Sequence, residues 1–388
     1  RSLGRRMTDA WIVGAVRSPV GRRGGALSTV HPADLGAHVL RALVERTGVD
    51  PGEIDDVLWG CVGQVGAQAS NIGRTTVLSA GWPEHVPAMT IDRQCGSSQQ
   101  ALHAAAHQIR AGDADLVVAG GVEVMSQVPI ASPTRLGLEA GMAHPRGGAD
   151  WAARYGDEEI SQFRGAELIA KRWGLDRARM ERFAVESHRR AIASTAAGDF
   201  EAEIAPLPGL AVDEGPRSDT SAERLAGLTP LQPGGRITAA LASQVSDGAA
   251  ALLVASDRAV DRNRLTPLAR VHTMAVVGSD PVLMLTGPIP ATATVLHRTG
   301  LSLAEIDTIE INEAFASVVL AWADETDADL DRVNPQGGAL ALGHPLGATG
   351  ARLMTTLVHR MGRDHLRYGL QLMCEGGGMA NATVLERA

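Results

Sequence analysis

The sequence of 388 residues contains few cysteines, a single lysine and no long apolar run. Its three cysteines are too few for a disulfide framework in a chain of this length, so we expect a reducing compartment and a cytoplasmic protein. No apolar run approaches the roughly 20 residues that a membrane-spanning helix needs, and no membrane span is expected. Lys171 is the only lysine, so arginine carries nearly all of the positive charge.

The net charge of −8 and the lack of a basic tract argue against nucleic acid as a partner. Hydrophobic residues make up 45% of the chain, and its length allows two or three packed units with a large core. Six residues precede Met7, which looks like a natural start. We expect residues 1–6 to be a cloning remnant or a short targeting remnant and leave them out of the fold prediction.

The stretch DRQCGSSQQALHAAAHQIRAG, residues 92–112, places Cys95 directly before a predicted helix. Small and apolar residues recur on one face of this helix, and Gly112 supplies a stop. Ser97 or Ser98 is expected to cap the helix through its side-chain oxygen. Because a helix N-terminus favours the thiolate, Cys95 is a candidate nucleophile. The alternative is a small buried hydrophobe, the usual role of a free cysteine.

Short apolar strands alternate with helical patterns, which indicates an α/β protein. The expected strands are 10–16, 56–60, 115–119, 308–311 and 369–373. A weak internal repeat gives each half a strand, a loop, a Gly/Ser-rich helix start and a strand that ends in glycines. Packed about a pseudo-two-fold axis, the halves would bring Cys95 and His344 to equivalent helix N-termini at one crevice. The alternative is the general self-similarity of α/β proteins.

The middle of the chain differs in texture, with Pro and Gly clusters around two helix patterns near 163–173 and 177–197. This segment is too long for a plain loop and is expected to lie over the crevice. The predicted division is an N-terminal half of 7–123 and 245–268, a loop domain of 124–244, and a C-terminal half of 269–388.

Three further residues carry candidate chemistry. His344 lies in the glycine-dense stretch 334–352, which lacks the Lys-Ser/Thr pair of a phosphate-binding P-loop and suits a narrow thioester chain. Cys374 ends a strand and could shuttle a proton beside a cysteine that carries an acyl group. Asn312 follows another strand and could hold a water or His344 in an oxyanion hole. The plainer interpretations are a structural histidine, a buried cysteine and a turn asparagine.

Eight motifs occur in an order that resembles the thiolase family of acetyl-CoA acyltransferases and 3-ketoacyl-CoA thiolases. They are RSPVGRRGGAL, DRQCGSSQQA, GGVEVMS, SQVSDGAA, TGPIPA, NEAFA, NPQGGALALGHPLGATGAR and CEGGGMANA. The resemblance runs from about residue 10 to the C-terminus. It implies a five-layer αβαβα fold of two similar halves plus an inserted loop domain. It also implies no permanently bound cofactor, CoA or acyl-CoA as substrate, and a homodimer or homotetramer.

The resemblance also implies roles for five residues. Cys95 would carry an acyl-thioester, His344 would draw off its proton, and Cys374 would be the acid/base at the acetyl α-carbon. Asn312 would position a water that forms one oxyanion hole with His344. The backbone N–H groups of Cys95 and Gly376 would form the other.

The coenzyme site matches the family less well. Ser243 corresponds to the family serine that contacts the pantetheine arm of CoA. The family usually has a basic residue before the proline equivalent to Pro230, but none stands there. Arg224 and Arg236 are therefore the candidates for the adenosine phosphates. Glu375 is a second departure, because the family usually has an apolar residue at this position.

Residues 161–163 contain no histidine of the kind found in short-chain biosynthetic thiolases. This departure favours a degradative thiolase that cleaves 3-ketoacyl-CoA with CoA to acyl-CoA and acetyl-CoA by a ping-pong route. The expected acyl chain is medium, long or bulky, a steroid-derived chain included. The alternatives are a short-chain acetyl-CoA C-acetyltransferase that condenses acetoacetyl-CoA, and a non-catalytic acyl-CoA or sterol-binding relative. A ketosynthase would carry a histidine in place of Asn312.

Other patterns have plain interpretations. His103 and His107 have the i, i+4 spacing of zinc ligands but no third ligand, so no metal is expected. Cys61 is expected to be a packed residue at a strand end. Three aromatic residues at helical spacing are expected in the core: Phe163, Trp173 and Phe183.

Overall fold

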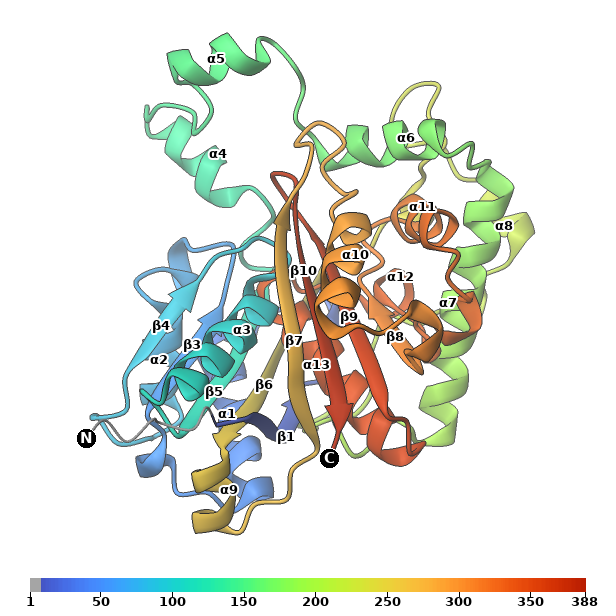
Figure 1. The fold of residues 1–388 in the computed structure, drawn as a ribbon. Helices are drawn as coiled ribbons and strands as arrows, with labels where there is room; N and C mark the ends of the chain where they lie inside the picture. The colour runs from blue at the N-terminus through green and yellow to red at the C-terminus, as the bar shows by residue number, and fades with distance from the viewer. Residues whose placement is uncertain (1–7) are drawn as a thin grey trace.

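The computed structural model describes residues 8–388, so the expected start at Met7 and the residues before it lie outside the described part. One mixed sheet runs through the molecule in the order β4-β3-β5-β6-β1-β7-β10-β9-β8, with β2 beside β6 (Figure 1). The strands are β1 (Ala10–Arg17), β2 (Gly21–Arg22), β3 (Asp56–Gly60), β4 (Ala88–Ile91), β5 (Leu116–Val124), β6 (Ser246–Ser256), β7 (Ala269–Gly278), β8 (Thr308–Ile311), β9 (Tyr368–Glu375) and β10 (Met379–Arg387). All five predicted strands are confirmed, and β5 extends beyond its predicted end.

The helices account for the other layers. They are α1 (Pro32–Thr47), α2 (Ile72–Ser79), α3 (Ser97–Ala111), α4 (Ser132–Glu139), α5 (Ala149–Tyr155), α6 (Gln162–Arg172), α7 (Arg177–Ala197), α8 (Ala222–Ala226), α9 (Asp257–Asn263), α10 (Pro288–Thr299), α11 (Ala316–Thr326), α12 (Ala339–Leu342) and α13 (Leu346–Arg363). Gly112 ends α3 in the left-handed conformation, as the sequence predicts. Among the helices of residues 8–388, none is both long and apolar enough to cross a membrane.

The sheet consists of two parts that meet at a narrow junction. Strands β4, β3, β5, β6 and β1 belong to the first part, and β7, β10, β9 and β8 to the second. The two parts share only the antiparallel pairing of Trp11 with Arg270 and of Ile12 with Ala269. In each part an outer pairing is parallel, β3 with β4 and β8 with β9, as the repeat in the sequence suggests.

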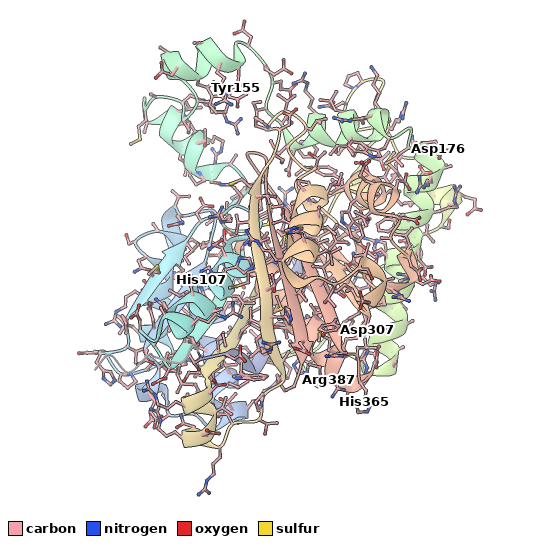
Figure 2. The ribbon with its side chains drawn as sticks, viewed as in Figure 1. His107, Tyr155, Asp176, Asp307, His365 and Arg387 are labelled. Atoms are coloured by element: carbon pink, nitrogen blue, oxygen red, sulfur yellow. The ribbon has the colours of Figure 1, made fainter. Side chains whose placement is uncertain are left out.

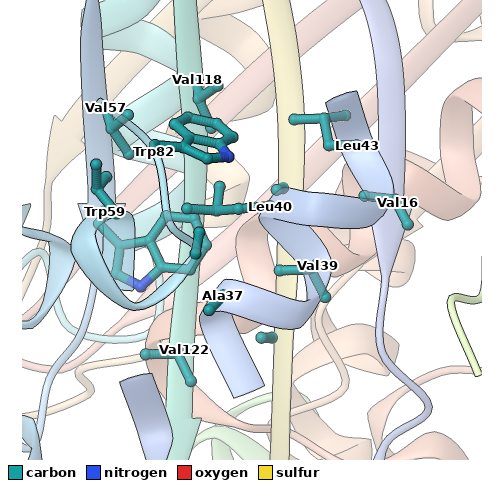
Figure 3. Close-up of a cluster of buried hydrophobic side chains, with 14 of the residues drawn as sticks. Val16, Ala37, Val39, Leu40, Leu43, Val57, Trp59, Trp82, Val118 and Val122 are labelled. Carbon is teal, nitrogen blue, oxygen red and sulfur yellow. The ribbon is translucent and has the colours of Figure 1, made fainter. Parts of the chain in front are cut away.

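The layers stack in the order αβαβα. On the outer face of the first part, α1 and α2 bury one apolar cluster, in which Figure 3 shows Leu40 of α1 beside Trp59 of β3 and Val118 of β5. On the outer face of the second part, α10 and α11 bury another cluster. Between the two parts, α3 and α13 share a core with strands of both. The predicted five-layer α/β fold is therefore confirmed.

The first turns of α3 and α13 lie in direct contact because both are built from small residues. The Ala351 N–H donates to Ser98 Oγ over 2.8 Å. A methyl group at Gly350 would overlap the backbone of Gln99, and one at Gly347 would lie 2.6 Å from the Cα of Cys61. Larger side chains would force the helices apart. The contact places the residues before both helices at one point between the layers.

The segment between the halves has two different portions. The two predicted helix patterns are confirmed as α6 and α7, and α7 packs against α11 and α12. The segment with α4 and α5 projects from the body (Figure 1), and most of its side chains are exposed. The division into 7–123 with 245–268, 124–244 and 269–388 stays a prediction.

The helix contact predicts an unusual response to a glycine-to-alanine substitution. Gly350→Ala should lower the free energy of unfolding by about 1–3 kcal/mol, because the added methyl group overpacks the contact with α3. Gly362→Ala, on the exposed end of the same helix with open space around it, should be neutral or stabilising by up to about 1 kcal/mol. Urea denaturation followed by circular dichroism measures both. Equal stability of the two variants would contradict the packing argument.

Candidate active site

Cys95 lies in a tight turn between β4 and α3. Gln94 before it has a φ of 49°, which is uncommon for a residue with a side chain. Ser97 fixes this turn, since its Oγ accepts the Arg93 N–H over 2.9 Å and donates to the Gln94 carbonyl over 2.5 Å. Strained backbone of this kind often marks a functional turn. The turn holds Cys95 at the head of α3.

The predicted serine cap of α3 is wrong. The helix begins after Gly96, and no side chain caps it. The Ser97 hydroxyl bonds within the turn, and the Ser98 hydroxyl accepts the N–H of Ala351 in α13. Both serines therefore serve contacts outside their own helix.

The surroundings of Cys95, a partly buried residue, favour the protonated thiol. Burial is the larger cause and the negative charge of Glu375 the next, and together they raise the pKa of Cys95 to about 12. The N–H groups of Gly376 and of Cys95 itself bond the sulfur and act in the opposite direction. The expected resting thiolate is therefore wrong, and Cys95 needs a base. The two N–H groups predicted as an oxyanion hole do lie at this sulfur.

Cys374 lies close to Cys95, near the end of β9. Its side chain is fully buried. Burial, and then the charge of Cys95, raises the pKa of Cys374 well above its ordinary value, so this thiol also holds its proton. Gly376 follows two residues later. The structure thus brings Cys95, Cys374 and Gly376 together.

His344 precedes α13 by two residues, as Cys95 precedes α3. Its Nδ1 lies 2.6 Å from Thr349 Oγ1. Because the Thr349 hydroxyl donates to the Pro345 carbonyl over 2.9 Å, it must accept from Nδ1–H. The hydrogen-bond network therefore assigns the proton to Nδ1 and leaves a lone pair on Nε2. Asn312 Nδ2 lies 3.4 Å from this Nε2 and can donate to it.

The imidazole of His344 is neutral at physiological pH. Burial is the larger cause and the positive charge of Arg352 the smaller, and together they lower the pKa of His344 to about 3. Asn312, at the end of β8, donates its backbone N–H to the Leu372 carbonyl, two residues before Cys374. His344 and Asn312 are thus tied to the strand that ends in the second cysteine.

A cleft of about 510 Å³ is lined by three arginines, by Asp219 and other polar residues, and by apolar residues such as Leu225 and Leu340. Gln244 also lines it, and the Gln244 carbonyl accepts the His344 N–H over 3.1 Å. Ser243 precedes Gln244 in the chain. Arg224 lines the cleft, together with Arg22 and Arg217. The guanidinium of Arg236 instead donates to carbonyls of Ala170 and Leu175.

Comparison with known proteins identifies this arrangement. The family description "Thiolase, N-terminal domain" matches residues 10–258, and "Thiolase, C-terminal domain" matches residues 265–387. The chain belongs to the thiolase family. It is 56% identical over 98% of its length to a steroid 3-ketoacyl-CoA thiolase of Mycobacterium tuberculosis, of which the match covers 95%. It is 41% identical over 98% of its length to a 3-ketoacyl-CoA thiolase of Aeromonas salmonicida, covering all of that protein.

Two solved thiolase structures share the fold over the whole chain. The Bacillus anthracis acetyl-CoA acetyltransferase superposes with a TM-score of 0.90 at 37% identity, over 98% of this chain and 99% of that one. Human mitochondrial 3-ketoacyl-CoA thiolase superposes with a TM-score of 0.88 at 34% identity, over 98% and 100%. The thiolase fold predicted from the motifs is confirmed.

Two residues that support the site of this thiolase were not predicted from the sequence. Thr349 orients His344, but nothing in its local sequence marks it. Glu123 of β5 is buried, and its carboxylate accepts the N–H groups of Val62, Gly63 and Gly347 at 2.9 Å. An acidic residue in the otherwise apolar run LVVAGGVEV could have signalled this role. Glu123 joins the start of α13 to the loop after β3.

The histidine pair on α3 of this thiolase is not arranged as a metal site. The His103 ring is buried and bonded to Thr383 Oγ1 at 2.7 Å and to Asn381 Nδ2 at 3.2 Å. His107 is exposed on the same helix (Figure 2). Within residues 8–388, no group of three or more His, Cys, Asp or Glu side chains could hold a metal ion.

The predictions of packed residues at Cys61 and at three aromatic positions are confirmed only in part. Cys61 is buried directly after β3, which confirms a packed strand-end residue. Trp173 and Phe183 are partly buried against the core beside α6 and α11. Phe163 is 40% exposed and packs edge-on against Phe315, so its prediction as a core residue is wrong.

The orientation of His344 can be tested through Thr349. Thr349→Val removes the acceptor of the Nδ1–H and leaves a buried donor unpaired, which costs about 1–3 kcal/mol. We expect the rate of Cys95 acylation to fall by about 10- to 100-fold. Thr355→Val is the matched control, because this buried hydroxyl of α13 bonds only the Ala351 carbonyl. Stopped-flow acylation measures both variants, and an unchanged rate in Thr349→Val would refute the assigned tautomer.

Proposed function

We propose that this protein is a degradative thiolase that cleaves 3-ketoacyl-CoA with CoA to acyl-CoA and acetyl-CoA through an acyl-thioester on Cys95. One observation supports the proposal: a neutral His344, whose Nε2 lone pair lies 3.4 Å from Asn312 Nδ2, is linked through Asn312 to β9, the strand that carries Cys374 beside Cys95. The three groups provide a base, a nucleophile and an acid. No cofactor is bound permanently, and CoA enters as a substrate.

The first half-reaction begins with proton transfer from Cys95 to Nε2 of His344. The Cys95 sulfur attacks the 3-keto carbon, and the oxyanion is stabilised by the N–H groups of Cys95 and Gly376. The bond between the α-carbon and the 3-keto carbon then breaks, leaving the acyl group on sulfur. The electron pair leaves with the acetyl-CoA enolate, whose oxygen is stabilised by His344 and by a water that Asn312 positions.

Cys374 completes the cleavage as an acid. Its buried thiol gives its proton to the α-carbon of the enolate, which releases acetyl-CoA. In the second half-reaction the Cys374 thiolate takes the proton of an incoming CoA thiol. The CoA sulfur then attacks the thioester and releases acyl-CoA from Cys95. The departing Cys95 thiolate recovers from His344 the proton that it gave up in the first step. The result is a ping-pong reaction that leaves both cysteines and His344 as they began.

The cleft provides a site for the coenzyme. Arg22, Arg217 and Arg224 line it and would bind the adenosine phosphates, since guanidinium groups bind phosphate in a bidentate manner. Arg236 does not line this cleft, and its Nη1 donates to two carbonyl groups, so it is a weaker candidate for the phosphates than these three arginines. Ser243, beside the Gln244 that supports His344, would contact the pantetheine arm.

The relatives favour a degradative reaction on a long or bulky acyl chain, a steroid-derived chain included. The second candidate is a short-chain acetyltransferase, the activity in the name of the Bacillus anthracis structure. A non-catalytic acyl-CoA-binding role is disfavoured, because Cys95, His344 and Cys374 are all present.

The proposed compartment is the cytoplasm. All three cysteines are free, which fits a cytoplasmic enzyme.

The proposed oligomer is a homodimer or a homotetramer. Strand β4 lies at an edge of the sheet, where Met89 is 46% exposed, and Leu78 on α2 is half exposed. Exposed edge strands pair readily with another chain, so a homodimer would form there. Exposed apolar side chains around α4, such as Leu138 and Met142, would allow a tetramer.

Covalent labelling tests the proposed function. Incubation with a 3-ketoacyl-CoA and no free CoA should add the acyl mass to the Cys95 peptide, because the Cys95 sulfur lies at the N–H groups of Cys95 and Gly376 that would stabilise the oxyanion. Cys61 is the internal control and should stay unlabelled. Mass spectrometry after proteolysis measures each peptide. Label on Cys374 or Cys61 with none on Cys95 would overturn the assignment.

The same experiment separates the two cysteines. Cys374→Ala should still take up an acyl group on Cys95 from an acyl-CoA, but lose turnover by about 10²–10⁴-fold. It should also lose exchange of the acetyl α-protons of acetyl-CoA, measured by NMR in deuterated water. A variant that keeps most of its kcat would exclude Cys374 as the acid.

A substrate panel tests the acyl specificity. Each CH₂ that is buried can add about 0.8 kcal/mol of binding, so kcat/KM for thiolysis should rise several-fold per pair of carbons until the site is full. Acetoacetyl-CoA should be poor relative to 3-ketoacyl-CoAs with long or ring-bearing tails. The highest kcat/KM with acetoacetyl-CoA would replace the degradative proposal by the short-chain acetyltransferase.

A further inference from the structure

Glu375 is a buried carboxyl group that the proposed mechanism does not use. It follows Cys374 at the end of β9, and none of its surface is exposed. Neither of its carboxyl oxygens has a hydrogen-bond partner within residues 8–388. An ionised carboxylate in such a place would lose its hydration without compensation. Its surroundings therefore favour the protonated form.

The carboxyl group lies against the turn that holds the nucleophile. A methyl group built on Gly96 would overlap Glu375 Oε1 and lie 3.1 Å from Asn381 Oδ1. This amide oxygen also lacks a partner among the described residues. Two acceptor groups without partners therefore lie next to Gly96, in surroundings that do not stabilise an ionised carboxylate.

Three titratable groups lie near Glu375, two in the turn before α3 and one in β9. Arg93, in the turn before Cys95, supplies positive charge, but its Nε is unpartnered within residues 8–388 and it forms no ion pair with Glu375 there. Cys95 and Cys374 supply the two thiols. His103 approaches only through Asn381 and is neutral, because burial lowers its pKa to about 3. A charge on Glu375 would therefore disfavour ionisation of both thiols, and it would be attracted by Arg93.

The reaction makes this charge important. Cleavage passes through a Cys95 thiolate and then an enolate, both negative and both formed in a buried site. A second buried negative charge next to them would raise the energy of each.

We propose that Glu375 is a positioning residue that controls the charge around Cys95: when protonated it lets the thiolate form, and when ionised it blocks acylation. The proposal rests on the proposed function of Cys95. The proton of Cys95 still passes to His344, and Glu375 makes no bond to the substrate. Burial raises the pKa of Glu375 to about 8. Because the ionised form dominates above this pH, acylation should decline on the alkaline side.

Alkylation of Cys95 by iodoacetamide measures this control directly. The rate is followed by mass spectrometry of the Cys95 peptide in wild type and in Glu375→Gln, with the Cys61 peptide as internal reference. The ratio of the variant rate to the wild-type rate should be near one below about pH 7, where the glutamate is protonated. It should rise to about tenfold at about pH 9, which corresponds to a tenfold change in thiolate population.

Two further variants separate charge from packing. Glu375→Asp keeps a carboxyl group and should keep the alkaline decline. Glu310→Gln is the matched control, because Glu310 is also fully buried, with a pKa raised to about 8 by burial, but faces Arg352 instead of Cys95. Its ratio to wild type should stay near one at every pH.

The outcomes distinguish the two proposals. If wild-type Cys95 takes no acyl group from 3-ketoacyl-CoA, the proposed function fails. If Cys95 is acylated but Glu375→Gln follows the wild-type alkylation rate at every pH, only the role of Glu375 is overturned. Should Glu375→Gln not fold, infrared titration in the Glu310→Gln background replaces it. The protonated carboxyl band must then vanish with the midpoint at which acylation declines, and a different midpoint would refute the proposal.

Discussion

The direct contact between the first turns of α3 and α13 is the constraint on which the rest of the structure depends. Each helix follows a candidate catalytic residue by two positions, Cys95 in one case and His344 in the other. The helices can approach because Gly347 and Gly350 leave room for the backbone of the neighbouring segments. The two halves of the sheet share only two residue pairs, so the helix layer between them carries much of their association. The same packing that joins the halves therefore forms the site.

Burial has opposite effects on the two kinds of reactive group, and the result is a resting site with little charge. It raises the pKa of the thiols of Cys95 and Cys374, and it lowers the pKa of the His344 imidazole. In both cases the neutral form gains, because a charge without hydration is unfavourable. Charge then appears only as substrate is converted, at the N–H groups that are already in place. Glu375 fits this rule when it holds its proton.

The motifs were sufficient to predict the layers and the strands, because these depend on local patterns and on a shared order of motifs. They also supplied the five candidate catalytic residues, whose roles stay predictions. The failures have tertiary causes. Ser97 and Ser98 have good capping chemistry, but the turn before α3 and the backbone of α13 use their hydroxyls. The assignment of Arg236 as a phosphate ligand stays a prediction, because its side chain is exposed and only its Nη1 donates to carbonyl groups.

The thiolate prediction failed on magnitude. A helix N-terminus stabilises a negative charge by about 0.3–1 kcal/mol at exposed sites and by about 2 kcal/mol at best. The rise of the Cys95 pKa from 9.0 to about 12 corresponds to about 4 kcal/mol. Burial outweighs the dipole, but the depth at which a residue will be buried cannot be read from the residues next to it.

The burial of the residues around Cys95 also affects how a thioester formed on Cys95 would react. His344 is 4% exposed, and Asn312 and Cys374 are fully buried. In the proposed reaction a thioester on Cys95, which is itself partly buried, would be bordered by these buried groups, and they limit its contact with bulk water. Whether the acyl group passes to water or to the CoA thiol is decided by the relative rates of the two reactions, because hydrolysis of a thioester is the more favourable outcome at equilibrium. By keeping water away, the fold lets each cleavage conserve its energy as a new activated acyl group instead of releasing it as heat.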